Sequence, residues 1–191
     1  MVLVLCIGDL HIPHRAADLP AKFKELLKPG KIHTTICVGN VCSKVFLDYL
    51  RTISGELHVV AGDFDEFPAP EQLVVDIAGF KVGVCHGHQI IPWSDPDAVS
   101  LLQRQMGADI LVTGNTHRFE ARKAGPCLAL NPGSATGAYH VACPPSSPPP
   151  TPSFVLMDLD GSKVTVYVYQ LVEGEVRVEK IDYAKGATQP V

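Results

Sequence analysis

Five short apolar segments of the sequence, rich in β-branched residues, each run into a glycine and a side chain able to bind a metal ion. These segments end in Gly8-Asp9-Leu10-His11, Gly39-Asn40, Gly62-Asp63-Phe64-Asp65, His86-Gly87-His88 and Gly114-Asn115-Thr116-His117. Short β-branched runs are typical of strands, and ligands of an open α/β sheet bind where the strands end at their carboxyl edge. The sequence therefore predicts a sheet with these side chains gathered at one edge.

Helical patterns alternate with these strands through the first two thirds of the chain, which indicates βαβ units and an α/β fold. We expect strands at residues 2–7, 34–38, 57–60, 81–85 and 109–113. Two helices are predicted between them by apolar residues at helical spacing. The first contains Leu19, Phe23, Leu26 and Leu27 and ends at Pro29 and Gly30, and the second contains Phe46, Tyr49, Leu50 and Ile53. A third should begin at Asp95 as N-cap and bury Ala98, Leu101, Leu102 and either Gln105 or Met106.

The pattern changes beyond Pro132, where apolar and polar residues alternate over residues 153–159, 163–171 and 176–183. This alternation predicts antiparallel strands that close the second sheet of a sandwich. Residues 141–152 are rich in proline, which fixes φ and removes hydrogen-bond donors, so they should form an exposed loop. We expect one domain over residues 1–184, a sandwich of two mixed sheets flanked by helices, followed by a flexible tail at 185–191.

Composition narrows the classes of function. The chain has 191 residues, 46% of them hydrophobic and 19% charged, which favours one packed domain. A net charge of −4 supplies no basic field for a phosphate backbone, so nucleic acid is not an expected partner. The opening apolar run is too short and lacks the basic flank of a signal peptide or membrane span. Direct membrane insertion is therefore not expected.

The six cysteines of the chain admit two interpretations. They could form disulfides, but Cys6, Cys37 and Cys85 each fall within an apolar run that resembles a central strand. A free cysteine in that setting behaves as a small hydrophobic residue. We therefore expect reduced thiols and a reducing, cytosolic compartment.

The strand-end side chains combine carboxylates and imidazoles, the ligands of a borderline metal such as zinc, manganese or iron. A single Asp or His after a strand is as well explained as a turn or cap residue. Five such positions in succession favour the metal interpretation.

The order of these motifs resembles that of the calcineurin-like metallophosphoesterases, whose pattern is D-x-H, GD, GNH-[DE], a single His and GHxH. The resemblance implies their sandwich fold. It assigns Asp9, His11 and His117 to a first metal, Asp63 and His86 to a second, and Asn40 to the bridge between them. The implied cofactor is a divalent ion, Zn or Mn, weakly bound and not required. His88 matches no ligand position, and we expect it to hydrogen-bond to the ligands.

The chain departs from this family pattern at three functional positions. Asn40 replaces the bridging carboxylate, Phe64 replaces the histidine that protonates the leaving oxygen, and Asn115 is a weakened ligand in place of the first His of GHxH. A positioned general acid typically contributes about 10²- to 10⁴-fold to a rate. These departures predict a weak or single-metal site and a non-catalytic protein. The alternatives are an active metal-dependent phosphoesterase and a metal-free interaction module.

Longer stretches, at residues 9–15, 19–24, 86–93, 131–139 and 153–158, resemble the small-subunit family of retromer. This resemblance implies a scaffold subunit for endosomal protein transport, located in the cytoplasm and on the cytosolic face of endosomes. It implies that Ile91, Pro92 and Trp93 contact the C-terminal solenoid of the large subunit, vacuolar protein sorting-associated protein 35. An exposed Trp beside a Pro is a reasonable interface anchor, although Trp93 could instead cover the end of the core.

The same resemblance implies a second surface, formed by Leu26, Leu156, Tyr167 and Tyr169, that binds a Rab-GTPase-activating protein and a Rab-effector ankyrin protein. Tyr167 and Tyr169 are two apart on an expected strand and face the same way, whereas Val166 and Val168 face the other. If the valines are core, the tyrosines form an exposed aromatic stripe. In the opposite arrangement, the tyrosines pack under a helix.

Overall fold

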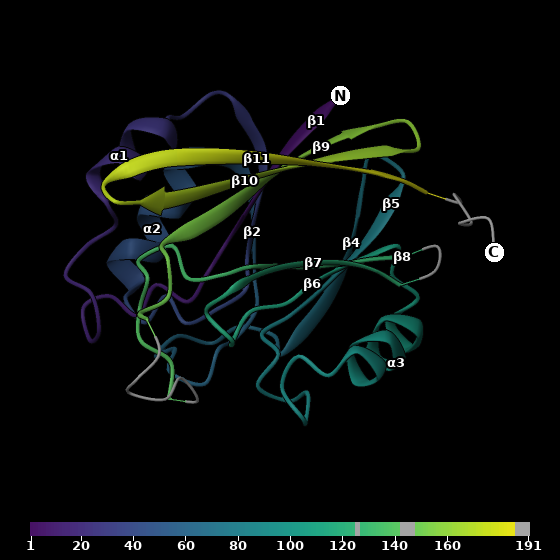
Figure 1. The fold of residues 1–191 in the computed structure, drawn as a ribbon, viewed down its shortest axis with the longest axis horizontal. Helices are drawn as coiled ribbons and strands as arrows, with labels where there is room; N and C mark the ends of the chain where they lie inside the picture. Colours follow the sequence, from purple (N-terminus) through teal and green to yellow (C-terminus); the bar gives the residue numbers. More distant parts are fainter. Residues whose placement is uncertain (125–126, 142–147, 186–191) are drawn as a thin grey trace.

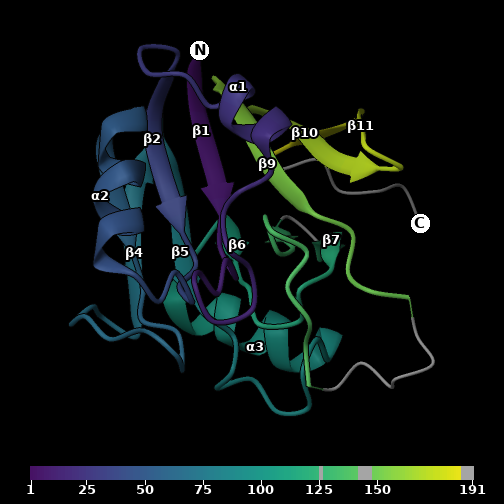
Figure 2. The same cartoon turned by 90° about the vertical axis from the view of Figure 1, so that its left-hand side faces the viewer.

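Two β-sheets pack face to face in the computed structural model, which describes residues 1–124, 127–141 and 148–185 (Figures 1 and 2). The six-stranded sheet has the order β11-β10-β9-β1-β2-β3, and the five-stranded sheet has the order β4-β5-β6-β8-β7. Helices lie against the outer faces of both sheets (Figure 2). The predicted sandwich of two mixed sheets flanked by helices is confirmed.

The six-stranded sheet contains the first and the last strand of the described residues. Its strands are β1 (Val2–Ile7), β2 (Ile32–Cys37), β3 (Ser54–Val59), β9 (Ser153–Asp160), β10 (Lys163–Val172) and β11 (Glu175–Ala184). β1 pairs with β2 in parallel and with β9 in antiparallel orientation. The three C-terminal strands are antiparallel as predicted, but they extend the sheet of β1 instead of closing the second sheet. Alternation fixes which side chains of a strand face inward and leaves its pairing partner open.

The five-stranded sheet contains two of the predicted strands and three that the sequence patterns did not reveal. Its strands are β4 (Gln72–Ile77), β5 (Phe80–Cys85), β6 (Ile110–Val112), β7 (Phe119–Ala124) and β8 (Cys127–Pro132). The hairpin between β4 and β5 turns at Ala78 and Gly79, with φ angles of 50° and 84°, which are the positive values of a type I′ turn. β7 lies at the sheet edge and carries charged residues, which discourages pairing with other chains.

All three predicted helices are present, as α1 (Ala21–Leu26), α2 (Lys44–Ile53) and α3 (Pro96–Met106). The Asp95 carboxylate accepts from the Ala98 N–H at 2.9 Å, so Asp95 caps α3 as expected. The prediction that Leu101 is buried is wrong, because Leu101 is 52% exposed. Gln103 faces the sheet instead, where its amide donates to the carbonyls of Ala108, Asp109 and Leu128. These hydrogen bonds fix the rotation of the helix.

The sandwich contains three apolar clusters, one between the sheets and one on each outer face. In β1, Val4 and Cys6 face the other sheet, while Leu5 and Ile7 face α1 and α2. Burial of both faces explains why this strand is an uninterrupted apolar run. In β10 the valines at 164, 166 and 168 are fully buried between the sheets. Tyr169 therefore lies on the outer face, where it stacks on Phe154 with ring centroids 4.7 Å apart.

Other features of the described residues bear on the sequence expectations. The cysteines among them are free, and Cys6, Cys37 and Cys85 are buried. Residues 142–147 of the expected proline-rich loop and 186–191 of the expected tail lie outside the described residues. In the rest of that loop, Pro148 and Pro149 are exposed but Pro150 is buried. Within the described ranges, no helix has the length and apolar character needed to cross a membrane.

Replacing Leu50 of α2 by alanine should destabilise the fold. Leu50 is fully buried against the six-stranded sheet, and a buried Leu→Ala change typically costs about 2–5 kcal/mol. Val45 lies on the same helix but is 81% exposed, so Val45→Ala should shift stability by no more than about 0.5 kcal/mol. Urea unfolding followed by circular dichroism measures both values. Equal losses in the two variants would contradict the assigned packing of α2.

Candidate metal centre

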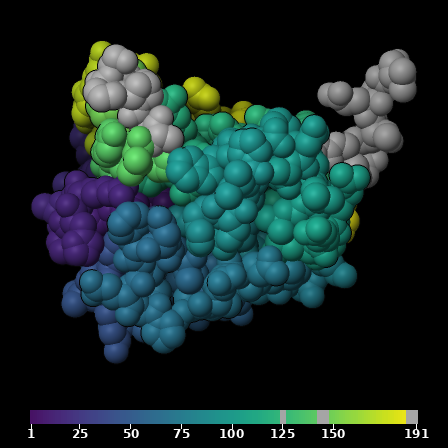
Figure 3. Space-filling model, turned by 90° about the horizontal axis from the view of Figure 1, so that it is seen from below, coloured from purple at the N-terminus to yellow at the C-terminus, as the bar shows by residue number. Residues whose placement is uncertain are grey.

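The loops at the carboxyl edge of the sheets meet on the lower face of the molecule. Figure 3 looks onto this face, where the purple segment after β1 lies between blue residues that follow β3 and green residues that precede β9. Asp9, His11, Asn40 and His117 adopt positive φ angles of 50°, 47°, 54° and 58°. Such values are uncommon outside glycine and must be held by surrounding structure. Here the Asp9 N–H donates to Gly39 O at 3.0 Å, and the His11 N–H donates to Asn40 O at 2.8 Å.

Glycine is required where two of these loops cross. Gly39 has a φ of +91°, and a Cβ added to it would lie 2.6 Å from the backbone nitrogen of Gly62. A Cβ on Gly62 would in turn lie 2.2 Å from the side-chain oxygen of Asn40. The glycines that precede Asn40 and Asp63 therefore allow the two loops to approach each other closely.

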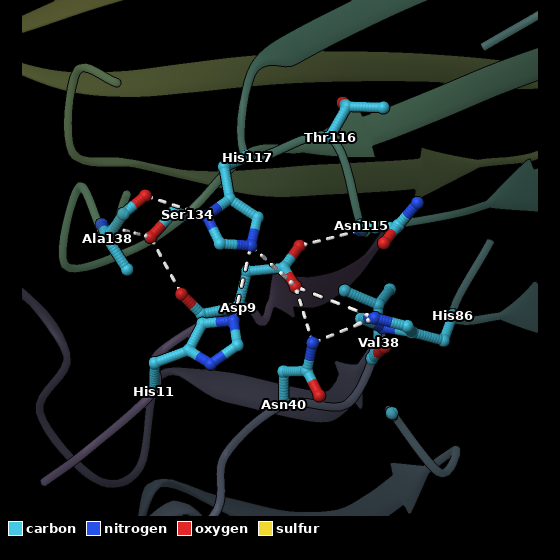
Figure 4. Close-up of polar contacts among 12 residues, drawn as sticks. Asp9, His11, Val38, Asn40, His86, Asn115, Thr116, His117, Ser134 and Ala138 are labelled. Atoms are coloured by element: carbon cyan, nitrogen blue, oxygen red, sulfur yellow. Dashed lines mark hydrogen bonds and ion pairs between the residues drawn. The ribbon is translucent and has the colours of Figure 1, made fainter. Parts of the chain in front are cut away.

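Asp9 is the centre of this site (Figure 4). Its side chain is fully buried, and its Oδ2 accepts from the Asn115 N–H at 2.8 Å. Its Oδ1 lies 3.5 Å from His117 Nε2 and 3.8 Å from His86 Nε2. We call Asp9, His11, His86 and His117 the cup.

Backbone carbonyls set the orientation of two histidines in the cup. His117 Nδ1 lies 2.7 Å from Ala138 O, and His86 Nδ1 lies 2.6 Å from Val38 O. A carbonyl only accepts, so each Nδ1 carries the proton that it donates, and each Nε2 points into the cup (Figure 4). A histidine that ligates a metal is usually held in this way through its other nitrogen.

The first predicted metal cluster fits a divalent ion. The candidate ligand atoms of Asp9, His11 and His117 all lie within 4.8 Å of one another, and all three residues are buried. His11 Nε2 is only 3.2 Å from His117 Nε2. Burial, together with the neighbouring Arg15 and His117, lowers the pKa of His11 to about 3, so its ring is neutral near pH 7. One carboxylate and two imidazoles are a donor set that suits zinc.

The residues of the second predicted metal cluster, Asn40, Asp63 and His86, are hydrogen-bonded to one another. Asn40 Nδ2 lies 2.9 Å from both Asp63 Oδ1 and His86 Nε2, and Asn40 Oδ1 accepts from the Phe64 N–H at 3.0 Å. Interaction with His86 holds the pKa of Asp63 well below its usual range. Burial opposes the charged form of His86, but the charges of Asp9 and Asp63 raise its pKa. The amide nitrogen of Asn40 thus faces the groups that the resemblance assigns to a second metal.

The side chains of two expected contributors make no hydrogen bond to the ligands at their buried nitrogens. His88 was expected to hydrogen-bond to a ligand, but its ring lies 5.4 Å from that of His86, and its buried Nδ1 has no partner. The expectation for His88 is therefore wrong at this nitrogen. The Asn115 side chain points away from Asp9 and His117 (Figure 4). Its buried Nδ2 also has no hydrogen-bond partner.

Sequence reasoning missed several residues that hold the cup in place. Asp65 accepts from the backbone N–H groups of Asn40, Gly62 and Cys42, each at 2.8 Å. Ser134 Oγ donates to the backbone oxygen of Asp9 at 2.7 Å. Asp65 stands within a motif and could have been singled out, whereas the contact of Ser134 bridges segments far apart in the chain.

Phe64 and Arg15 lie at the mouth of the cup. The Phe64 ring is edge-on to His11 with centroids 5.4 Å apart, and the Arg15 guanidinium lies 4.7 Å from the centre of the same ring. Phe64 is 47% exposed. Neither side chain can act as a proton donor near neutral pH, since a phenyl ring has no labile proton and arginine does not deprotonate in proteins.

The residues expected to contact the large subunit follow β5, and Trp93 among them reaches the cup through His140. Ile91 is 80% exposed and Trp93 is 45% exposed, and Pro92 between them is exposed. Trp93 lies edge-on to His140, with ring centroids 5.1 Å apart.

The residues expected to bind regulators lie on the outer face of the six-stranded sheet. Leu156 of β9 is the direct partner of Tyr167 on β10. Leu26 and Tyr169 line one groove, whose other walls are Lys22, Glu25, Glu175, Val176 and Val178. The four expected residues thus lie on one face of α1, β9 and β10.

Comparison with known proteins identifies the family. A model of the calcineurin-like phosphoesterase superfamily domain matches residues 2–162. The chain is also 46% identical over 185 residues to vacuolar protein sorting-associated protein 29 of Schizosaccharomyces pombe, an alignment that covers 96% of this chain and 99% of the relative. The chain belongs to the vacuolar protein sorting-associated protein 29 family. The resemblance to the small-subunit family of retromer is thereby confirmed.

Solved structures of this family agree with the fold and with the metal. Wild-type Vps29 of Entamoeba histolytica complexed with Zn²⁺ is 48% identical, with a TM-score of 0.88 and coverage of 95% of this chain and 99% of that one. Vps29 of Chaetomium thermophilum complexed with a cyclic peptide is 40% identical, with a TM-score of 0.85 and coverage of 97% and 98%. A weakly bound divalent metal fits both the cup and the zinc complex of the relative.

Zinc binding should depend on Asp9. Asp9→Ala removes the only anionic member of the cup, so zinc affinity should fall by at least the roughly 10- to 100-fold that loss of a supporting group around a metal site costs. Isothermal titration calorimetry with Zn²⁺ measures this change. Asp76 of β4 is an exposed carboxylate, and Asp76→Ala serves as the control that keeps wild-type affinity. Equal affinity in the wild type and Asp9→Ala would place the zinc site elsewhere.

Proposed function

We propose that this protein is a non-catalytic scaffold subunit of retromer in endosome-to-Golgi and endosome-to-plasma-membrane protein transport. In this role it caps the C-terminal helical solenoid of the large subunit, vacuolar protein sorting-associated protein 35. It works in the cytoplasm, on the cytosolic face of endosomes, without inserting into the membrane. The observation that carries the proposal is the exposed apolar rim of the cup.

The rim is formed by large apolar side chains that remain exposed around a buried polar centre. Its members are Phe64, Ile91, Trp93, Tyr139 and Val141, each at least 45% exposed. Three of them contact the cup or its immediate neighbours: Phe64 lies against His11, Trp93 lies against His140, and Tyr139 O accepts from Arg15 at 2.7 Å. Apolar surface gathered in this way favours a protein partner. Exposed Trp and Tyr are also typical of the residues that dominate binding energy.

The mouth of the cup argues for a protein partner rather than for turnover. Hydrolysis of a phosphoester needs a proton for the leaving oxygen, and Phe64 occupies the position where the superfamily resemblance expects the histidine donor. The neutral Asn40 also supplies no bridging charge to hold two cations together. The cup therefore keeps the shape and the metal donors of the superfamily without its acid.

A second surface supports the docking of regulators. The valines of β10 are core, so Tyr167 and Tyr169 face outward beside Leu26 and Leu156. The groove at Leu26 and Tyr169 is lined by apolar Val176 and Val178 and by charged Lys22, Glu25 and Glu175. This combination suits a short peptide that presents apolar side chains. We assign this surface to Rab-GTPase-activating and Rab-effector regulators.

Ile91→Asp should abolish capture of the large subunit. A carboxylate at the centre of an apolar interface loses water without gaining a partner. The expected loss is at least about 2 kcal/mol, which corresponds to roughly a 30-fold fall in affinity. Pull-down and calorimetry with the purified large subunit measure it, and circular dichroism verifies the fold. Because Ile91 is 80% exposed, the monomer should fold normally. Unchanged capture would remove the rim from the interface.

The regulator surface provides the reciprocal control. Leu156→Asp combined with Tyr167→Ala should leave capture of the large subunit intact and weaken a regulator-derived peptide, whereas Ile91→Asp should do the reverse. If the double variant bound the peptide as well as the wild type, the assignment of this surface to regulators would be wrong.

An active metal-dependent phosphoesterase is the second candidate, favoured by the Asp9, His11 and His117 cluster. The scaffold proposal predicts little or no turnover of a generic phosphodiester by the pure protein supplied with Zn²⁺ or Mn²⁺. Release of product from a chromogenic diester measures this rate. Robust hydrolysis that Asp9→Ala abolished would favour the enzyme instead.

A further inference from the structure

A continuous series of aromatic ring contacts crosses the mouth of the cup. Trp93 lies edge-on to His140 at 5.1 Å, and His140 lies edge-on to His117 at 5.0 Å between ring centroids. His117 contacts His11 at 4.9 Å, and His11 is edge-on to Phe64 at 5.4 Å. We call these five rings the aromatic arc. Edge-to-face contacts of this kind are favourable beyond the area that they bury.

The two ends of the arc are exposed and its middle is buried. Trp93 and Phe64 are 45% and 47% exposed, whereas His11, His117 and His140 are at most 7% exposed. The exposed ends belong to the apolar rim, and two of the buried rings belong to the metal cluster. The arc therefore places the proposed partner surface in direct contact with the candidate metal ligands.

The segment 138–140 attaches the arc to the cup at three consecutive residues. Ala138 O accepts from His117 Nδ1 at 2.7 Å, Tyr139 O accepts from Arg15 at 2.7 Å, and His140 contacts both His117 and Trp93. Any constraint on the His117 ring thus acts on both neighbours of Tyr139. His140 is the ring through which that constraint reaches Trp93.

We propose that metal binding in the cup and docking of the large subunit are coupled, and that His140 is the positioning residue that transmits the coupling. A metal held by His11 and His117 fixes the orientation of both rings and draws electron density from them. Ring edges with more positive charge make stronger edge-to-face contacts. Trp93 and Phe64 are then held in the orientation that the partner meets. The inference rests on the proposed scaffold function.

Coupling of this kind is reciprocal. If the metal raises the affinity for the large subunit by some factor, docking of the large subunit must raise the affinity for the metal by the same factor. The metal thus has a role in assembly that needs no chemical turnover, and a weak site in the isolated protein becomes a tighter site in the complex.

Fluorescence of the isolated protein tests the first half of the proposal. Trp93 is the single tryptophan of the chain, so emission from this residue reports on the arc. Titration with Zn²⁺ should change the emission in step with occupancy of the cup, measured in parallel by competition with a chromogenic chelator. His140→Ala should bind zinc and lose the emission change, and His140→Phe, which keeps a ring, should restore it. His14→Ala, at an exposed histidine, should behave as the wild type. An emission change that persists in His140→Ala at full zinc occupancy, or is absent from the wild type, would overturn the proposal.

Affinity for the purified large subunit tests the second half. Zinc-loaded protein should bind at least about fivefold more tightly than chelator-treated protein, a coupling at the lower end of the usual range. In His140→Ala the two affinities should be equal. Equal affinities in the wild type would refute the coupling and leave the scaffold function standing. Failure to bind with or without zinc would refute the scaffold function, while the response of Trp93 would still decide whether metal and arc are linked.

Discussion

The buried carboxylate of Asp9 is the constraint on which the rest of this structure depends. An isolated carboxylate removed from water costs several kcal/mol unless donors or cations surround it. The chain supplies them from distant segments: the Asn115 N–H after β6, and the imidazoles of His86 and His117. The Oγ of Ser134, which follows β8, donates to the backbone oxygen of Asp9. One charge thus joins the edges of both sheets, and a divalent cation beside it adds the strongest compensation available.

The same requirement explains how a buried site of this kind can persist under the proposed non-catalytic function. The donors around Asp9 stabilise the meeting of the loops whether or not a substrate is bound, so their loss would cost stability as well as metal affinity. Phe64 does not compensate the charge of Asp9, because it lies half-exposed at the mouth and contacts the site through one edge-on ring contact. Residues that protonate a leaving group can therefore be exchanged for an apolar rim while the buried cup is retained.

The sequence predicted those features that depend on local patterns. β1 was placed at its observed bounds, because a strand buried on both faces is an unbroken apolar run, and Asp95 was identified from its capping chemistry. The sequence could not predict which sheet contains β9, β10 and β11. The alternation of apolar and polar residues is the same whichever sheet a strand joins. The burial of Leu101 was predicted wrongly because three carbonyls outside α3 select the buried face of the helix through Gln103. His140 was missed because its importance arises from two ring contacts, with Trp93 and His117, that only the fold creates.

Paired strands of the six-stranded sheet join the cup to the regulator surface. Asp9 follows β1 directly, and Leu5 of β1 is the pairing partner of Leu156, which in turn pairs with Tyr167. Phe154, fully buried in β9, holds the outer face by stacking on Tyr169 and packing edge-on to Phe23 of α1. Continuous hydrogen-bonded pairing between these strands fixes the distance and angle between the cup and the regulator surface. The proposed scaffold must hold two partners in constant relation. The paired strands fix Asp9 relative to the regulator surface, while Ile91 and Trp93 of the rim follow β5 of the other sheet.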